Sequence, residues 1–179
     1  MPDIVIISGS PEKKSKSHHI LKVIQEQFQY AEITTKLYSV RDFPAEDVLY
    51  GQYNSEVFDD LKKDISNAQT VIIGTPIYKG AYTGILKALL DLLPQYALRG
   101  KRLLPIATAG SMAHLLAIDF AIKPVLSVLG SSEILPGIYI PDENWKKEES
   151  GEIALDEPVK SRLNLAIENI IEFHQKIAG

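Results

Sequence analysis

The sequence contains no cysteine among its 179 residues, and this absence excludes several kinds of chemistry. Disulfide bonds, thiolate nucleophiles and cysteine-ligated metal sites all depend on that residue. A chain without cysteine is compatible with a reducing compartment, so we expect a cytoplasmic protein.

The sequence also lacks an excess of basic residues and any long apolar run. Lysine and arginine total 19 against 23 acidic residues, which gives a net charge of −4 at pH 7. A nucleic-acid-binding protein would normally present a basic face, so we expect no such partner. No apolar stretch approaches the ~20 residues of a membrane span, and the N-terminus has no signal-peptide pattern. A hydrophobic share of 45% suits one buried core, so we expect a single domain over residues 1–179.

Several motifs that carry chemistry are absent as well. The chain has no P-loop, no GxSxG elbow and no HExxH, and its first loop has one glycine where GxGxxG needs three. The four histidines do not show the spacing of metal ligands, so we predict no metal site. We assign no catalytic side chain and no hydrolase site.

What the sequence does contain is a regular alternation of β-branched runs and segments with helical periodicity. This alternation predicts an α/β fold, a parallel sheet with helices on both faces. Five strands suggest the doubly wound, flavodoxin-like order 2-1-3-4-5. Strands are predicted at 4–8, within 31–38, and at 71–73, 103–108 and 132–140. Helices are predicted from about 20 to 28, near 45–49, and at 55–67 (with Ser55 as a possible N-cap), 86–93, 113–129 and 158–177, with a charged excursion over 142–151.

The chain is organised around residues 70–94. We expect Gly74-Thr75-Pro76 to end a buried strand, because proline cannot donate to a sheet ladder. A loop over residues 77–80 then precedes a helix that stops at Pro94. The loop places a proline, an aromatic side chain and a cation at the carboxyl end of a central strand, where open α/β sheets bind ligands. This mixture suits a flat heteroaromatic ring, and the alternative is ordinary turn chemistry.

Two further loops would converge on the same place. Residues 8–17 are rich in serine and lysine and precede a helix N-terminus, an arrangement that favours a phosphate. They fit the terminal phosphate of a mononucleotide better than a pyrophosphate, although a solvated, serine-capped turn would look similar. Residues 108–111 are small enough for a ligand to approach the backbone closely. Ser111 could instead cap the next helix, and both roles can hold together.

The motifs in these loops resemble those of the NADPH-dependent FMN reductases. The resemblance rests on GSP with its serine-rich loop, on TPIYKGAYTGILKALLDLLP and on ATAGSMAHLLAIDFAIKPVL, and it extends to about Leu135. It is strongest to the branch that supplies reduced flavin to an alkanesulfonate monooxygenase. The resemblance implies a flavodoxin-like fold, FMN at the switch point of the sheet, hydride transfer from NADPH to FMN, and a homodimer or homotetramer.

The resemblance also implies which residues of this chain bind the cofactor. They are, for the phosphate, Ser10, Ser15 and Ser17; for the isoalloxazine ring, Pro76, Ile77, Tyr78 and Lys79; and for its other edge, through backbone groups, Thr108, Ala109, Gly110 and Ser111. Catalysis then needs no side-chain acid or base, because the cofactor carries the reaction. The loop lysines at 13, 14 and 16 are candidates to attract NADPH.

Two residues depart from the family pattern. Ala109 stands where the family usually has the first of two glycines, which is tolerable unless the backbone needs a positive φ. Phe120 stands where the related branch has a tyrosine in an inserted π-helical turn. Pro124 would clash with the carbonyl of residue 120 in a regular helix, so we expect a π-bulge or kink between these two residues.

The sequence therefore predicts an NADPH-dependent FMN reductase, and the resemblance implies that it supplies reduced flavin to a partner monooxygenase. An FMN-containing quinone or azo-compound reductase, a flavodoxin-type electron carrier, and a regulatory module for another phosphorylated ligand are the alternatives. The sequence leaves open whether FMN is a substrate or a prosthetic group, and whether NADH also serves.

Overall fold

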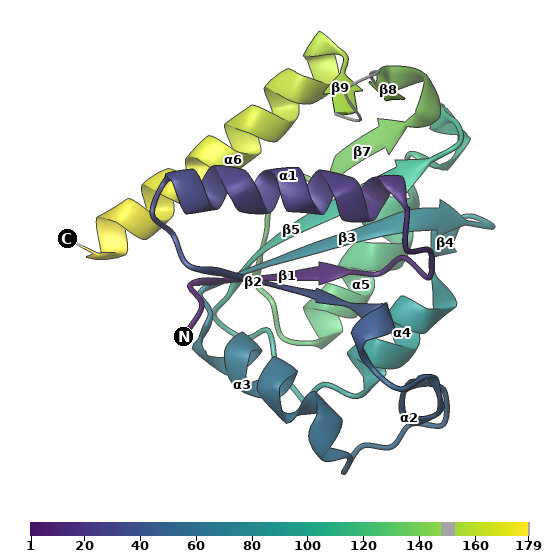
Figure 1. Ribbon diagram of the computed structural model, residues 1–179, viewed down its shortest axis with the longest axis vertical. Coiled ribbons are helices and arrows are strands. Elements are labelled where there is room, and N and C mark those ends of the chain that lie inside the picture. Colours follow the sequence, from purple (N-terminus) through teal and green to yellow (C-terminus); the bar gives the residue numbers. More distant parts are fainter. Residues whose placement is uncertain (148–152, 179) are drawn as a thin grey trace.

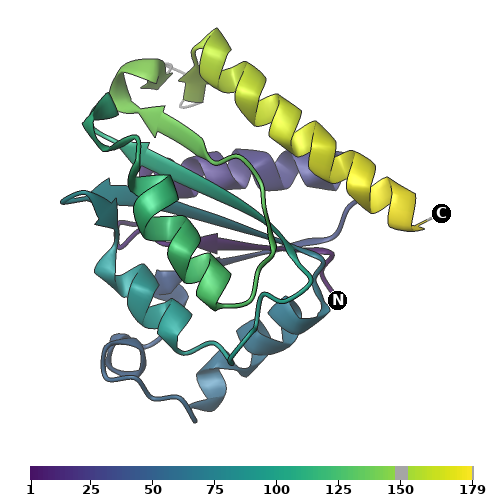
Figure 2. The ribbon, with the colours of Figure 1, turned by 180° about the vertical axis from the view of Figure 1, so that it is seen from behind.

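A computed structural model describes residues 1–147 and 153–178 of the chain. Its centre is a mostly parallel sheet with helices packed on both faces (Figure 1; Figure 2). The strands are β1 Ile4–Ser8, β2 Thr35–Ser39, β3 Thr70–Tyr78, β4 Ala81–Tyr82, β5 Arg102–Ala109, β6 Glu133–Ile134, β7 Ile138–Pro141, β8 Trp145–Lys147 and β9 Ile153–Leu155. The α-helices are α1 Lys16–Tyr30, α2 Ala45–Leu49, α3 Asp59–Asn67, α4 Gly84–Asp91, α5 Lys123–Val128 and α6 Glu157–Ala178.

The sheet has the predicted order. Its strands run β2-β1-β3-β5, and β6 and β7 both pair with β5 beyond it. Counting β6 and β7 as one broken strand and leaving out the short β4, this is the order 2-1-3-4-5. The flavodoxin-like prediction is confirmed.

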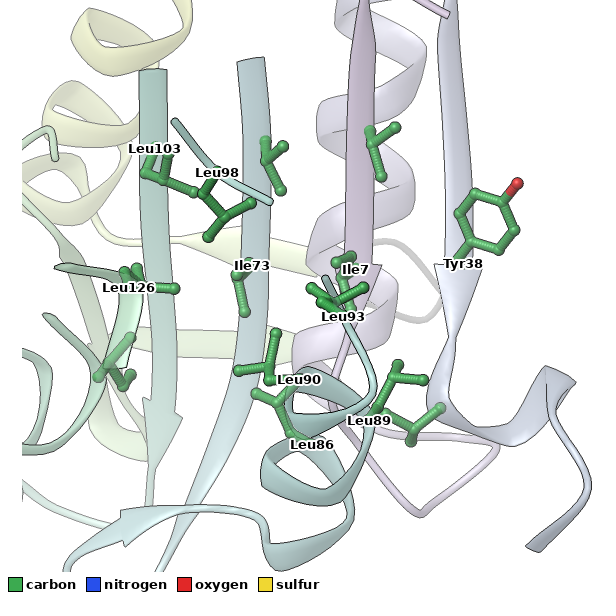
Figure 3. Close-up of a cluster of buried hydrophobic side chains, with 14 of the residues drawn as sticks. Ile7, Tyr38, Ile73, Leu86, Leu89, Leu90, Leu93, Leu98, Leu103 and Leu126 are labelled. Carbon is green, nitrogen blue, oxygen red and sulfur yellow. The ribbon is translucent and has the colours of Figure 1, made fainter. Parts of the chain in front are cut away.

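Alternate residues of each central strand pack into two separate hydrophobic cores, one on each face of the sheet. Ile4 and Ile6 of β1 face α1 and α6, whereas Val5 and Ile7 face α3 and α4. Figure 3 shows the second core, where Ile7 and Ile73 lie opposite leucines of α4. Burial of each such side chain stabilises the fold by about 1.5–3 kcal/mol. This two-sided burial explains why the strands read as continuous apolar runs.

The prediction that Gly74-Thr75-Pro76 ends the central strand is wrong, because β3 continues to Tyr78. The Gly74 carbonyl accepts a hydrogen bond from Gly9 N at 2.7 Å, just past the last paired residue of β1. Pro76 lies two residues further on and faces the same side, where β1 has already ended. Its missing N–H therefore costs no ladder bond, while β3 still pairs with β5.

The expected loop over residues 77–80 is a β-hairpin. β4 pairs antiparallel with the end of β3 through Ile77–Tyr82 and Tyr78–Ala81. The two connecting residues, Lys79 and Gly80, have φ values of 53° and 85°. Positive φ at both positions is the requirement of a type I′ turn, although lysine is an unusual choice for the first of them.

The helix predicted over residues 113–129 is not continuous. A short 3₁₀ turn at Met112–His114 is followed by a π-helical turn at Ile118–Ile122 and then by α5. Pro124 lies in the first turn of α5, where its missing N–H costs least. The predicted π-bulge is confirmed, and it begins slightly earlier than Phe120.

The last predicted strand and the excursion after it also differ from expectation. The strand is split into β6 and β7 by residues 135–137, which include Pro136 and Gly137. At the start of the excursion, Asp142–Asn144 form a 3₁₀ turn, and β8 then pairs antiparallel with β9. Residues 148–151 of the expected excursion lie outside the described residues.

The remaining helices match the prediction with one exception. α6 packs against the core through its apolar face, on which Leu163 and Ile167 are buried. Ser55 does not cap the helix that follows, because its hydroxyl donates to Asp47 Oδ2 at 2.8 Å. Among the described residues, none of the helices has the length and apolarity needed to cross a membrane.

Candidate cofactor site

A cavity of about 240 Å³ lies at the carboxyl edge of the sheet, where β1, β3 and β5 end. Each of the three loops singled out in the sequence contributes to its wall. The lining residues are Glu12, Lys14, Ser15, Lys16, Pro76, Ile77, Tyr78, Thr108, Ala109, Gly110 and Asp142. The topology thus brings together segments that are up to 130 residues apart, since residue 142 is 130 positions after residue 12.

The first loop delivers Ser15 and the amino end of α1 to this cavity. Ser15 caps α1, because its hydroxyl accepts a hydrogen bond from His18 N at 3.1 Å. Its hydroxyl also lies 3.2 Å from that of Ser17, which is fully buried. Ser10 is buried too, and its hydroxyl accepts from Glu12 N at 3.1 Å. Of the three predicted serines, only Ser15 therefore lines the cavity.

The side chain of His18 connects the first loop to the end of β1. Its Nδ1 lies 2.9 Å from the hydroxyl of Ser8, the last residue of β1. Burial lowers the pKa of the His18 imidazole, and the charge of Lys22 lowers it further. The side chain is therefore neutral at pH 7 and holds the loop without adding charge.

The hairpin forms the second wall. Pro76, Ile77 and Tyr78 line the cavity, whereas Lys79 lies in the exposed turn outside it. Burial and the nearby charge of Glu12 raise the pKa of Tyr78, so its phenol stays protonated near neutral pH. Behind the hairpin, the Thr83 hydroxyl donates to Gly9 O at 2.5 Å. This bond fixes the hairpin relative to the first loop.

The third loop presents mainly backbone. Thr108, Ala109 and Gly110 line the cavity, while Ser111 lies beside it and caps the following turn through Ala113 N at 3.3 Å. The carbonyl of Ser111 accepts a hydrogen bond of 2.6 Å from the Tyr139 hydroxyl. This contact anchors the loop to β7.

The substitution at Ala109 is compatible with the fold. Ala109 belongs to β5 and has no positive φ, so its methyl group causes no backbone strain. Gly110 likewise has no positive φ, and a Cβ placed there would meet no protein atom within 4 Å. The fold itself therefore does not require glycine at 110, and its small size leaves room on the side of the cavity.

Sequence reasoning missed Asp142 and Glu12 as residues of the cavity. Asp142 directly follows β7, so the rule that ligands bind at the carboxyl ends of parallel strands could have identified it. The expectation of a charged excursion over residues 142–151 hid that signal. Glu12 was passed over because the lysines and serines around it dominate the loop.

The chemistry of the lining fits a phosphorylated flat ligand. The first loop offers the Ser15 hydroxyl, a helix N-terminus and the charge of Lys14, which is not paired with a described residue, and together these suit an anion. Lys16 is instead paired with the lining carboxylate of Asp142. The hairpin offers proline, isoleucine and tyrosine opposite bare backbone, which suits an aromatic ring. FMN has both features.

Comparison with known proteins agrees with this fit. The family described as NADPH-dependent FMN reductase matches residues 2–146. An FMN reductase (NADPH) of Escherichia coli is 41% identical over 139 residues, which cover 78% of this chain and 73% of that protein. An FMN reductase (NADPH) of Pseudomonas putida is 40% identical over 176 residues, or 98% of this chain and 88% of that protein. The apo crystal structure of an NADH:FMN oxidoreductase (EMOB) has a TM-score of 0.84 and 34% identity, covering 96% of this chain and 89% of that one.

These matches confirm the resemblance in the sequence motifs, and with it the assignment as an oxidoreductase with FMN and NADPH as cofactors. The chain belongs to the NADPH-dependent FMN reductase family.

Proposed function

We propose that this chain binds FMN in the cavity at the carboxyl edge and reduces it with NADPH. The observation that carries the proposal is that all three predicted loops line one cavity, with anion-binding groups at one end and a flat apolar wall at the other. Bound FMN supplies the hydride-accepting chemistry. The protein supplies position and electrostatics.

The predicted cofactor-binding residues have different roles according to where they lie relative to the cavity. Lys14, Ser15 and the amino end of α1 would hold the phosphate, because Lys14, Ser15 and the first helical residue, Lys16, line the cavity. Ser10 and Ser17 are buried and hydrogen-bonded within the loop, so we assign them to ordering its amides. The ring would lie between the hairpin residues 76–78 and the backbone of 108–110, which line the cavity, while Lys79 and Ser111 follow them in the chain outside the lining.

A stripe of exposed apolar residues supports self-association. Met112, Leu116, Phe120, Pro124 and Val128 recur every four residues, and Phe120 is 77% exposed. Exposed apolar side chains that gather in one segment are typical of a subunit interface. β4 of the hairpin packs against the π-helical turn, so this stripe lies next to the flavin site. We propose a homodimer or homotetramer formed through it.

Substitution of Phe120 tests the interface. The variant Phe120→Lys should lower the mass measured by light scattering to that of the protomer. Tyr30→Lys is the matched control, since Tyr30 is 88% exposed and lies at the far end of α1. Equal masses for wild type and Phe120→Lys would contradict the proposed interface.

The wider role follows from the resemblance to the branch that serves alkanesulfonate monooxygenases. We propose a cytoplasmic enzyme, one functional domain over residues 1–179, that passes reduced flavin to a partner monooxygenase. NADPH is the expected hydride donor. Its rate of oxidation should be compared with that of NADH, because some similar proteins are named for NADPH and others for NADH.

Oxidation of NADPH in air, titrated with FMN, tests the function. We expect negligible oxidation without FMN and saturation as FMN is added, which would mark flavin as a substrate. Rapid oxidation by a yellow protein without added FMN would instead indicate a prosthetic flavin and favour a quinone or azo-compound acceptor. If the protein bound FMN but oxidised no NADPH under either condition, its assignment as an enzyme would be contradicted. A flavodoxin-type electron carrier would then be the remaining interpretation.

A further inference from the structure

Lys16, the first residue of α1, is held by a segment far along the chain. Its ammonium nitrogen lies 2.6 Å from Asp142 Oδ1 and 4.0 Å from the centre of the Trp145 ring. Lys16 and Asp142 both line the cavity at the carboxyl edge. The ion pair therefore forms part of the wall that would meet an anionic ligand.

The fold fixes the partners of Lys16. Trp145 opens β8, which pairs with β9, and its ring packs against the core between α1 and α6. Asn144 donates a side-chain hydrogen bond to Asp156, and Asp156 in turn accepts from Val159 N at 3.2 Å in the first turn of α6. Asp142 therefore lies between β7 and the β8–β9 ribbon, which these hydrogen bonds attach to α6. The position of its carboxylate is fixed by both neighbours.

The other loop lysines differ from Lys16. Lys13 and Lys14 are exposed, and neither forms a salt bridge with another of the described residues. The charge of Lys16 is balanced by Asp142, whose side chain is 47% exposed. A phosphate that entered the cavity would compete with Asp142 for Lys16 and would also be repelled by its carboxylate.

We infer that Asp142 limits the affinity of this site for the flavin phosphate by withholding Lys16 from it. This inference rests on the proposed function and concerns how loosely the flavin is held. A weakened phosphate contact favours release of the reduced flavin as a product. Asp142 then shifts the balance toward FMN that leaves as a substrate and away from FMN that stays bound.

The test compares FMN with riboflavin, which lacks the phosphate, by isothermal titration calorimetry. Asp142→Asn should tighten FMN binding by about three- to tenfold, since one like charge near the phosphate is removed and Lys16 is released. Riboflavin binding should change by less than about twofold, because it carries no phosphate charge. The gain for FMN should shrink as ionic strength rises.

Two further variants separate Lys16 from general charge effects. Asp142→Asn with Lys16→Met should return FMN affinity to within about twofold of wild type, because the pair is removed as a neutral unit. Glu133→Gln is the matched control. Glu133 is 48% exposed and also pairs with a basic side chain, Arg102, but it lies at the opposite edge of the sheet.

The outcomes are distinct. Unchanged or weaker FMN binding by Asp142→Asn, or an equal gain for riboflavin, would overturn the inference while leaving the proposed function intact. A double variant as tight as Asp142→Asn alone would show that Lys16 does not reach the phosphate and would overturn its part. Failure of the wild-type chain to bind either flavin would contradict the proposed function, and this inference with it.

Discussion

The two edges of the sheet use basic side chains differently. At the amino edge, Lys101 is buried, and its ammonium donates to the carbonyls of Ser66 and Ala68 at 3.1 and 2.7 Å. These carbonyls belong to the end of α3 and the residue after it, so Lys101 acts as a cap. At the carboxyl edge, Lys14 is exposed in the cavity wall. The ammonium of Lys101 is satisfied inside the protein, whereas that of Lys14 is available to solvent and to a ligand.

Glycines show the same contrast. A Cβ at Gly74, inside the sheet, would lie 2.7 Å from Leu21 Cδ1, whereas a Cβ at Gly110 would meet no protein atom within 4 Å. The first glycine is required for packing, and the second is not. Because Gly110 lies in the cavity wall, its missing side chain leaves space there for a ligand. The difference teaches which residues belong to the fold and which to the site.

Loss of the buried cation should have the largest effect on stability. Lys101→Met leaves two carbonyls at the end of α3 without a charged donor and should lower the free energy of unfolding by about 2–3 kcal/mol. Urea unfolding followed by circular dichroism measures this change. Lys63→Met on the exposed side of α3 should cost less than about 0.5 kcal/mol. FMN affinity should be the same in both variants. If Lys101→Met alone lowered FMN affinity, the amino edge would also contribute to flavin binding, which would contradict the difference between the edges.

The two glycines should respond in opposite ways. Gly74→Ala should destabilise the chain by about 1–3 kcal/mol, because its methyl group overlaps Leu21. Gly110→Val should leave the midpoint of urea unfolding unchanged and weaken FMN binding by at least about tenfold, or ~1.4 kcal/mol. A destabilised Gly110→Val with normal flavin affinity would place that glycine in the fold and not in the site.

Ser15 contributes both to the stability of the fold and to the wall of the cavity. Ser15→Ala removes the hydroxyl that accepts from His18 N and should lower the free energy of unfolding by about 1 kcal/mol. Because that hydroxyl also faces the cavity, FMN affinity should fall while riboflavin affinity changes little. Calorimetric titration with the two flavins separates these effects. An equal loss for both would assign Ser15 to the fold alone.

The smallest expected effect is a pH dependence at His174. This buried imidazole lies 2.9 Å from Thr70 Oγ1, and burial lowers its pKa from 6.5 despite the opposing charge of Asp3. The unfolded chain therefore takes up the proton at a higher pH than the folded chain. The stabilisation is complete above pH 6.5 and is lost as pH falls, by at most about 1.4 kcal/mol per pH unit.

Thermal unfolding between pH 7.5 and 5.5 measures this dependence. His174→Gln keeps a hydrogen-bonding group beside Thr70 but does not titrate, so its melting temperature should fall less steeply with pH. The pKa of His18 is lowered in the same way, so part of the slope should remain. An unchanged slope in His174→Gln would show that His174 does not contribute.

Much of the fold could be predicted because its signals are local. The run at Ile4–Ser8 and the short helix at Ala45–Leu49 have the predicted bounds, and the alternation of strands and helices determined the sheet order. The clash between Pro124 and the preceding turn correctly indicated the π-helical turn. In each case a few neighbouring residues contain the physical cause.

The errors have causes that lie elsewhere in the chain. Pro76 does not end β3 because β1 has already stopped beside it, which no local pattern reveals. The hairpin was missed because Lys79 occupies a positive-φ position that asparagine or glycine usually marks. The contact between Lys16 and Asp142 joins residues 126 positions apart, so only the folded sheet brings them together. The site loops were predictable, but the pairing of their charges was not.

Hydrogen–deuterium exchange with and without FMN tests the contrast between the edges most directly. The account predicts slower exchange on FMN binding in residues 8–17, 75–82 and 108–114, and unchanged exchange in residues 94–102 at the amino edge. Protection centred on residues 94–102, or absent from two of the three loops, would contradict the assignment of the flavin site to the carboxyl edge.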